Sequence, residues 1–210
     1  IADSAFADQA LYLQVTRGAD GKRDHAFPSA VSPTVFICST ALVVPSAAQR
    51  EFGVAARRAV DNRWLRCDLK TVSLLANVLL RQQAIDAGCA EAILLRDGLL
   101  TEGSSSNVFV VKDGVLATPL RDHRILAGIT RDLVLELAAQ QRMPCEVRDI
   151  SDAELRSADE LWLTSSTREV LPITSLDGQP VGTGRPGPVA RQMYDWYRAS
   201  REQATSSADV

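Results

Sequence analysis

The chain has 210 residues, of which 46% are hydrophobic and 23% are charged, an ordinary composition for a globular protein with a core. Its formal net charge is −3 and it contains no basic run, which argues against nucleic acid or an anionic membrane surface as a partner. Because the sequence has no stretch of about 18 consecutive apolar residues, no transmembrane helix is expected either.

The cysteines and histidines are too sparse and too scattered to predict a metal site. None of the four cysteines forms a CxxC pair, and only two histidines are present, so we expect no zinc. The cysteine spacing indicates reduced thiols in a cytoplasmic protein. The first ten residues, IADSAFADQA, contain neither an initiator methionine nor a signal-peptide pattern. We therefore expect that an N-terminal part of the protein precedes them.

The first quarter of the chain is expected to form two strands. Residues 10–18 and 34–44 are rich in apolar and β-branched side chains, which is typical of strands. The segment between them, 19–33, contains glycine and proline and is predicted to be a loop. Residues 45–53, PSAAQREFG, are interpreted as a linker between two subdomains.

A charged strand and a helix are expected next. Residues 54–64 are interpreted as a charged strand or an edge segment, and a helix fits them nearly as well. Beyond Lys70, apolar residues recur at helical spacing. They are Val72, Leu75, Val78, Leu79 and Ile85. Gly88 fits the position just after the last helical turn, where a left-handed backbone is favoured.

The second half of the chain alternates hairpins with helices. Asp-Gly pairs at 97–98, 113–114 and 177–178 each follow an apolar run, and this pair is the strongest short-range signal for a β-hairpin. Residues 125–141 are predicted to be a loop that leads into an amphipathic helix, and 187–202 a final helix. Hairpins mixed with helices predict a mixed α/β or α+β layout rather than a βαβ series.

Three polar segments and one lysine stand out against this background. The segments are TEGSSSNVF (101–109), GITRD (128–132) and TSSTRE (164–169). Taken singly, each has a plain interpretation: a solvated turn, a helix N-cap and a hydroxyl-capped turn. Lys70 lies just ahead of the helical pattern, where nothing in the local sequence calls for a charge.

Together these pieces supply what pyridoxal phosphate requires of a protein. Lys70 offers an amine for a Schiff base, and Glu102 offers a carboxylate for the pyridine nitrogen. The helix N-terminus after Gly128 and the hydroxyl groups of 164–169 offer a cup for the phosphate. We therefore expect Lys70 to be a buried nucleophile and not a solvated surface lysine.

Six stretches also carry a resemblance to a known family: VTRG…RDHAFP, RWLRCDLKT, TEGSSSNVFVVKDG, GITRD, TSSTRE and SLDGQPVGTGRPGPV. The chain resembles the class IV, or fold-type IV, pyridoxal-phosphate-dependent aminotransferases, which include D-amino-acid and branched-chain aminotransferases. The resemblance implies an α+β (mixed α/β) fold in two parts. Residues 1–45 would be the remainder of a small α/β domain, incomplete at its N-terminus. Residues 46–210 would form a large cofactor-binding domain with a β-barrel-like core and flanking helices.

The resemblance implies roles for particular residues. Lys70 would bind the cofactor covalently and carry the catalytic proton, and Glu102 would pair with the pyridine nitrogen. Leu126 would lie against the cofactor ring. Arg63 matches a position near the lysine whose role the sequence does not define. The implied phosphate-binding residues are Ile129, Thr130, Ser165 and Ser166.

Arg23 and His25 bear on the substrate. An arginine is the forked cation that an α-carboxylate favours, and in an extended loop both side chains would point to the same side. By themselves, the two residues are better explained as an incidental Arg-x-His in a solvated loop. D-amino-acid aminotransferases carry an Arg-x-His at this point as their carboxylate trap. The resemblance therefore implies transamination between a D-amino acid of the D-alanine or D-glutamate type and a 2-oxo acid such as 2-oxoglutarate.

Three alternatives stay open at this point. An L-branched-chain aminotransferase would need an apolar side-chain pocket and a carboxylate site that does not use Arg23 and His25. An aminodeoxychorismate lyase on the same fold would release pyruvate. A non-catalytic relative would act as a binding or structural protein, although the presence of Lys70 and Glu102 argues against this alternative. The family places its active site at a dimer interface, so a homodimer is expected.

Overall fold

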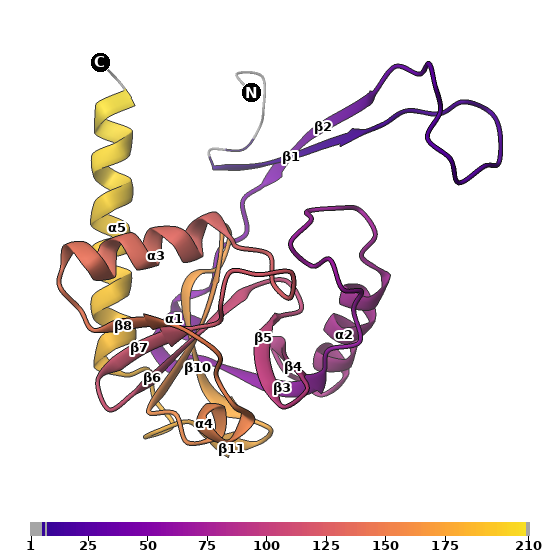
Figure 1. Cartoon of the computed structure of the whole chain (residues 1–210). Helices are drawn as coiled ribbons and strands as arrows, with labels where there is room; N and C mark the ends of the chain where they lie inside the picture. Colours follow the sequence, from indigo (N-terminus) through magenta and orange to yellow (C-terminus); the bar gives the residue numbers. More distant parts are fainter. Residues whose placement is uncertain (1–5, 7, 209–210) are drawn as a thin grey trace. The chain divides into compact units, whose positions relative to one another are not determined.

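The computed structural model describes Phe6 and residues 8–208. The chain divides into two compact units, Ile1–Val44 and Pro45–Val210, whose elements are labelled in Figure 1. This division falls next to the expected boundary between residues 45 and 46. The identification of the larger unit as a cofactor-binding domain stays a prediction.

The first unit is an antiparallel hairpin of β1 (Gln9–Thr16) and β2 (Thr34–Ala41). Both predicted strands are confirmed, and the second ends somewhat earlier than expected. The connecting loop, 17–33, requires glycine at Gly18. There φ is +110°, and a Cβ atom would collide with the carbonyl oxygen of Ser32, so no other residue fits without a shift of the backbone.

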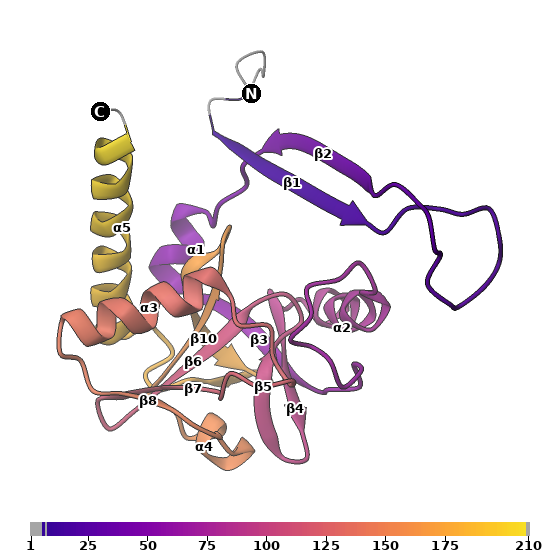
Figure 2. The same cartoon turned by 45° about the horizontal axis from the view of Figure 1, so that its top comes forward.

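The second unit is built on one large sheet, which curls from β5 to β8 in Figures 1 and 2. In the described residues this sheet has nine strands, in the spatial order β5-β4-β3-β10-β9-β6-β7-β8, with β11 beside β10. The strands are β3 (Val54–Val60), β4 (Glu91–Arg96), β5 (Leu99–Gly103), β6 (Asn107–Lys112), β7 (Val115–Thr118), β8 (Cys145–Val147), β9 (Glu160–Ser165), β10 (Glu169–Leu176) and β11 (Gln179–Pro180).

Strand β3 lies in the interior of the sheet, parallel to β4 on one side and to β10 on the other. The strand interpretation of 54–64 is therefore right, whereas the edge and helix interpretations are wrong. The charges are accommodated because Arg58 pairs with carboxylates of neighbouring segments. Its Nε lies 2.5 Å from Asp177 Oδ2 and its Nη1 2.5 Å from Asp152 Oδ1. A charged residue therefore does not place its strand at the edge of the sheet when side chains of opposite charge pair with it.

All three Asp-Gly pairs form the predicted hairpin turns. At each pair both residues have positive φ: 52° and 76° at 97–98, 49° and 78° at 113–114, and 51° and 76° at 177–178. This is the backbone of a type I′ turn, whose twist matches that of the strands it joins. The pairs connect β4 to β5, β6 to β7 and β10 to β11, so these local signals specify three of the antiparallel contacts of the sheet.

The interpretation of 45–53 as a linker is wrong, because most of it forms the short helix α1 (Ala47–Phe52). Ser46 and Gln49 build a capping box at its start. The Ser46 Oγ accepts from the Gln49 N–H at 3.2 Å, and the Gln49 Oε1 accepts from the Ser46 N–H at 3.0 Å. The S-x-x-Q signal of a helix start was present in the sequence and was overlooked.

Helix α2 (Leu75–Asp86) forms where the periodicity predicted a helix, although it begins at Leu75 and not at 72. Gly88 has φ +69° and follows the C-cap residue, as expected. Its N–H donates to the Ile85 carbonyl at 2.9 Å, and the Cys89 N–H donates to the Ala84 carbonyl at 2.8 Å. This pair of bonds is a Schellman motif, and it turns the chain directly into β4.

The remaining helices pack against two separate cores of the sheet. Helix α3 (Ile129–Gln140) and helix α5 (Pro188–Ala208) contact each other and β9, around a core that includes Phe109 and Trp162. The short helix α4 (Asp152–Arg156) adds Leu155 to a second core. Among the described residues, none of the helices combines the length and the apolar character that a bilayer crossing requires.

Candidate active site

One cavity in the second unit, with a volume of about 490 Å³, is lined by four separate segments of the chain. They come from residues 63–82, 102–107, 126–130 and 164–166, so the ends of β5 and β9 and the starts of α2 and α3 meet around it. The sequence-predicted residues that line this cavity are Lys70, Glu102, Leu126, Ile129, Thr130, Ser165 and Ser166.

Arg23 and His25 lie in the first unit, in the loop between β1 and β2, and both are exposed. The loop is not extended there. The Asp24 Oδ1 accepts from the N–H of His25 at 2.7 Å and from that of Ala26 at 3.3 Å, and the chain bends at these residues. The extended geometry that would point both side chains to one side is therefore absent. Their role in binding a carboxylate stays a prediction.

Lys70 lines the cavity but is exposed, so the expectation that it is buried is wrong. The reason lies in the segment that carries it. Between β3 and α2 the chain runs as a loop, held at Cys67, whose N–H donates to the His123 carbonyl at 2.9 Å. Cys67 is buried, whereas Asp68 and Leu69 are exposed. The lysine therefore stands at the rim of the cavity, where its amine is open to a ligand.

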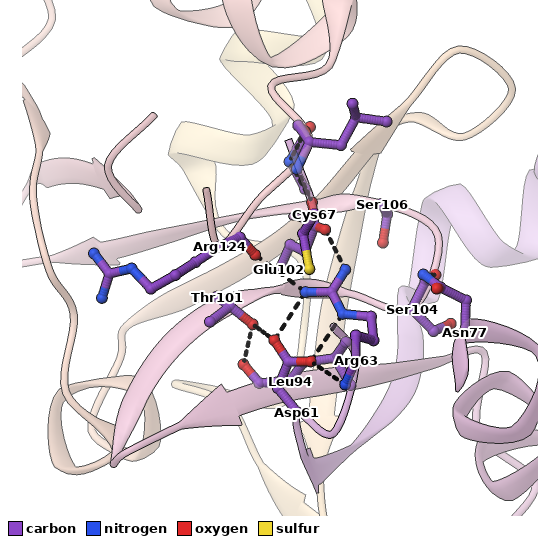
Figure 3. Close-up of polar contacts among 12 residues, drawn as sticks. Asp61, Arg63, Cys67, Asn77, Leu94, Thr101, Glu102, Ser104, Ser106 and Arg124 are labelled. Atoms are coloured by element: carbon purple, nitrogen blue, oxygen red, sulfur yellow. Dashed lines mark hydrogen bonds and ion pairs between the residues drawn. The ribbon is translucent and has the colours of Figure 1, made fainter. Parts of the chain in front are cut away.

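Glu102, near the end of β5, is a buried carboxylate beside the cavity. Its Oε1 accepts from Arg63 Nη1, and its Oε2 accepts from the Leu126 N–H at 3.0 Å and from Asn107 Nδ2 at 3.1 Å. Figure 3 shows the contact with Arg63. Burial raises the pKa of Glu102 to about 7, and the positive charge of Arg63 opposes that rise. Two opposing effects therefore act on the carboxyl group: burial favours its neutral form, and Arg63 favours its ionised form.

Arg63 is itself held by a second buried carboxylate, that of Asp61. The two side chains form a forked pair, with Nε to Oδ1 and Nη2 to Oδ2 both at 2.9 Å. Thr101 Oγ1 donates to Asp61 Oδ2 at 2.9 Å (Figure 3). Arg96 Nη2 lies 3.1 Å from Asp61 Oδ1. Burial acts to raise the pKa of Asp61, but the hydrogen bonds and charge of Arg63 outweigh it and lower the pKa to about 2.

Asn107 fastens the loop before α3 to Glu102. Its Nδ2 donates to the Leu126 carbonyl at 2.8 Å as well as to Glu102, and its Oδ1 accepts from the Gly128 N–H at 3.0 Å. A Cβ atom on Gly128 would lie 2.5 Å from that Oδ1. Glycine is therefore required for this close approach, which sets Leu126 and the start of α3 against the cavity.

The cavity contains the features of an anion site at the start of α3. Gly128 is the N-cap residue, and no side chain caps this end of the helix, so its first N–H groups are suited to an anion. Thr164 lines the same cavity, and its buried Oγ1 has no hydrogen-bond partner among the described residues. Thr130 lies in the first turn of α3, where its backbone N–H can serve an anion. Ser165 Oγ accepts from the Arg168 N–H at 3.1 Å.

Glu91 ties together the two serine-rich edges of the cavity. This fully buried carboxylate accepts from the hydroxyl groups of Ser104 and of Ser106, the latter at 2.8 Å, and pairs with Arg168 Nη1 at 2.5 Å. Through this pair, Arg168 anchors the 165–168 turn to Glu91.

Sequence reasoning missed Asp61, Glu91 and Asn107. Each is a buried polar residue at a strand terminus: Asp61 follows β3, and Glu91 and Asn107 begin β4 and β6. A buried polar side chain needs a hydrogen-bond partner, so the sequence could have indicated that these residues are paired. It could not indicate with which residue, because the partners are far apart along the chain, as Asp61 is from Thr101 and Glu91 from Arg168.

Comparison with known proteins agrees with this arrangement. The family described as amino-transferase class IV matches residues 2–176. A D-alanine aminotransferase from Bacillus licheniformis is 45% identical over 186 residues, which are 89% of this chain and 65% of that protein. One from Listeria innocua is 40% identical over 189 residues, again 89% and 65%. The chain thus spans about 65% of the length of these relatives.

Solved structures give the same result for the fold. The branched-chain amino acid aminotransferase of Escherichia coli matches with a TM-score of 0.78 and 30% identity, over 87% of this chain and 62% of that one. A hypothetical aminotransferase from Mycobacterium tuberculosis in its PLP-bound form matches with a TM-score of 0.78 and 25% identity, over 92% and 68%. The expected mixed α/β fold of type IV is confirmed. The chain belongs to the class IV aminotransferase family.

Proposed function

We propose that this protein is a pyridoxal-phosphate-dependent aminotransferase. It would move an amino group between a D-amino acid, of the D-alanine or D-glutamate type, and a 2-oxo acid such as 2-oxoglutarate. One observation carries the proposal: an amine, a buried carboxylate and an uncapped helix N-terminus line a single cavity. That combination is what the aldehyde, ring nitrogen and phosphate of this cofactor require.

The residues around the cavity fit the cofactor. The N–H groups of Ile129 and Thr130 at the start of α3, with the hydroxyls of Ser165 and Ser166, would hold the phosphate. The unpartnered Oγ1 of Thr164 supports this fit, since a buried hydroxyl without a partner is costly. Glu102 would accept the N–H of the ring, and the side chain of Leu126 would pack against the ring face.

The protein's own residues would perform two tasks in the reaction. Pyridoxal phosphate, when bound, supplies an aldehyde that takes up the amino group and a ring that accepts the electrons released at Cα. The Lys70 Nζ would remove the Cα proton of the substrate and return it at the neighbouring carbon, as a general base and then a general acid. The Glu102 carboxylate would hold a proton on the ring nitrogen. The exposed position of Lys70 leaves its amine free to move between these points.

The preference for D-amino acids is supported by the relatives, which are D-alanine aminotransferases at 40–45% identity. Arg23 and His25 are the residues that we propose for the substrate carboxylate. They would act after the loop between β1 and β2 changes its bent conformation, because that bend does not present both side chains to one side. Arginine suits this task because its fork matches a carboxylate.

Substitution of Arg23 by alanine is expected to raise the KM for D-alanine about 10- to 100-fold, the loss expected for a charge-assisted hydrogen bond of about 1.5–3 kcal/mol. The cofactor content should not change. Steady-state kinetics and the absorbance of bound cofactor measure the two quantities. Lys22→Ala is the matched control, because it removes a neighbouring cation from the same loop and should leave KM unchanged. An equal loss of cofactor and of substrate affinity would make Arg23 a structural residue.

An L-branched-chain aminotransferase is the second candidate. It is favoured by the similarity to the branched-chain enzyme of E. coli, but the D-alanine aminotransferases have higher identity to this chain. An aminodeoxychorismate lyase on the same fold is the third candidate. The two aminotransferase candidates differ in the hand of the amino acid that they accept.

A half-reaction distinguishes these candidates. The protein, loaded with pyridoxal phosphate, is mixed with D-alanine or with L-leucine in the absence of a 2-oxo acid, and the absorbance is followed. The proposal predicts that D-alanine converts the cofactor to its pyridoxamine form and that L-leucine does not. Conversion by L-leucine alone would favour the branched-chain candidate. A stable cofactor signal with neither amino acid, together with pyruvate release from aminodeoxychorismate, would favour the lyase.

We also infer a homodimer and a cytoplasmic location. Both rest on what is expected of the family, and the location is supported by the cysteines, which are free thiols within the described part of the chain. Free thiols are usual in reducing compartments. Sedimentation equilibrium of the purified protein would test the homodimer, since a mass of one chain would contradict it.

A further inference from the structure

Four charged side chains form a connected group behind Glu102. Asp61, Arg63 and Glu102 are buried and Arg96 is half-buried. Arg96 contacts Asp61. Asp61 contacts Arg63, and Arg63 contacts Glu102 (Figure 3). The group contains two negative and two positive charges, so it is neutral as a whole. Of its members, Arg63 and Glu102 line the cavity.

The contacts of Arg63 fix both its position and its orientation. One edge of the guanidinium, Nε and Nη2, is taken up by the two oxygens of Asp61 at 2.9 Å each. Nη2 also donates to the Arg124 carbonyl at 3.2 Å. The remaining nitrogen, Nη1, donates to Glu102. A planar fork that is held along one edge leaves a single direction for its third nitrogen.

Glu102 is held just as firmly while one of its oxygens keeps spare capacity. Its Oε2 accepts from the Leu126 N–H and from Asn107. Its Oε1 accepts from Arg63, and a carboxylate oxygen has a second lone pair. The position of Glu102 in the cavity wall makes that lone pair the one available to a ligand.

The positive charge of Arg63 favours the ionised form of the Glu102 carboxyl group. A carboxyl group buried as deeply as Glu102 favours its neutral form, and a nearby positive charge favours the ionised form. Asp61 acts in the opposite direction on Glu102 because it is a second negative charge in the same group. The other titratable or charged groups on the surrounding elements are Arg96 of β4, Cys67 and Lys70 of the loop before α2, and Arg81 of α2.

We propose that Arg63 is a positioning residue that keeps Glu102 ionised and aimed into the cavity, and that Asp61 holds Arg63 in place for this task. The proposal deepens the proposed function and rests on it, because the partner of the Glu102 carboxylate would be the ring nitrogen of pyridoxal phosphate. A neutral carboxylic acid cannot hold a proton on that nitrogen, whereas a carboxylate can. Arg63 would thus act on the cofactor through Glu102 without touching it.

The first test follows the ionisation of Glu102 itself, without cofactor. The side-chain carboxyl groups of glutamate are labelled with ¹³C, and the Glu102 resonance is assigned by its loss in Glu102→Gln. Its titration midpoint by NMR is expected near pH 7 in the unmodified protein. In Arg63→Met it should rise by about one to three pH units, the usual effect of an adjacent opposite charge. In Arg63→Lys, which keeps the charge, it should rise less.

Asp61→Asn tests whether Asp61 holds Arg63 in place. Loss of the forked ion pair should let Arg63 turn away from Glu102, so the Glu102 midpoint should rise, as in Arg63→Met. A fall of the midpoint, which removal of the second negative charge alone would cause, would show that Asp61 does not hold Arg63. This variant decides the question if Arg63→Met does not fold. Arg58→Met is the matched control, because it removes an arginine that is paired with two aspartates and does not line the cavity. An unchanged midpoint in Arg63→Met, or in Asp61→Asn, would overturn the proposal.

The second test uses pyridoxal phosphate with a ¹⁵N-labelled ring. The ¹⁵N chemical shift of the bound ring should indicate a protonated nitrogen in the unmodified protein and move toward that of a neutral ring in Arg63→Met, with partial recovery in Arg63→Lys. A shift that is the same in all three proteins would overturn the proposal. If the proposed function is wrong, the result differs from this one. The unmodified protein would then show no signal from a bound ring, while the titration of Glu102 could still be measured.

Discussion

Lys70→Ala is expected to abolish the absorbance band of covalently bound pyridoxal phosphate and to reduce transamination of D-alanine by about 10²–10⁴-fold, the range for loss of a general acid–base. The physical reason is that the amine both binds the cofactor and moves the Cα proton, and no other described lysine lines the cavity. Titration of the purified variant with the cofactor, followed by absorbance, measures the first effect, and single-turnover kinetics measures the second.

The chain offers a clear control for this variant. Besides Lys70 it contains Lys22 and Lys112. Lys112 Nζ lies 3.1 Å from Asp159 Oδ1 and 3.0 Å from the Ser157 carbonyl, on a different part of the sheet. Lys112→Ala should therefore keep both the band and the rate. Lys70→Arg retains the positive charge and should still lose the band. A band that survives in Lys70→Ala would show that another residue holds the cofactor.

Glu102→Gln is expected to leave most of the cofactor binding intact and to slow the D-alanine half-reaction by about 10²–10³-fold, the usual effect of removing one preorganised electrostatic partner from a transition state. Glutamine has nearly the shape of glutamate but no charge, so it cannot keep a proton on the ring nitrogen. The electrons released at Cα would then meet a weaker acceptor. Stopped-flow absorbance with D-alanine gives the rate of the step.

Glu136→Gln is the matched control for the loss of a carboxylate. Glu136 is exposed on α3 and does not line the cavity. It should leave the half-reaction unchanged. If the half-reaction of Glu102→Gln were as fast as that of the unmodified protein, Glu102 would not act on the ring nitrogen, and its contacts with Arg63, Asn107 and Leu126 would have only a structural purpose.

Much of the fold was predictable because its signals are local. The Asp-Gly pairs formed type I′ turns, Gly88 ended a helix with φ +69°, and the periodic segment after Lys70 became α2. The errors arose where local patterns are ambiguous. Within the charged segment 54–64, residues 54–60 form an interior strand, in which Arg58 pairs with Asp152 and Asp177. No pattern within β3 indicates those partners. Helix α1 was missed although its capping signal was visible.

The candidate site, like the fold, was predictable only in part. The residues with recognisable motifs, such as Lys70, Glu102 and Thr130, line one cavity, and their roles remain proposals. The exposure of Lys70 was not predictable, because it depends on how the loop from β3 to α2 is anchored at Cys67. The ion-pair group was not predictable either, since Asp61 meets Thr101 and Arg63 meets Glu102 only after parallel pairing of β3 with β4 brings them together.

The attachment point of the cofactor tests the central claim most directly. The protein is incubated with pyridoxal phosphate, reduced with borohydride, digested with trypsin and analysed by mass spectrometry. The account predicts that the phosphopyridoxyl group is found on Lys70, in a peptide that begins at Cys67 and continues past the blocked lysine to Arg81. A modification on Lys22 or Lys112, or none above the level seen in Lys70→Ala, would contradict it.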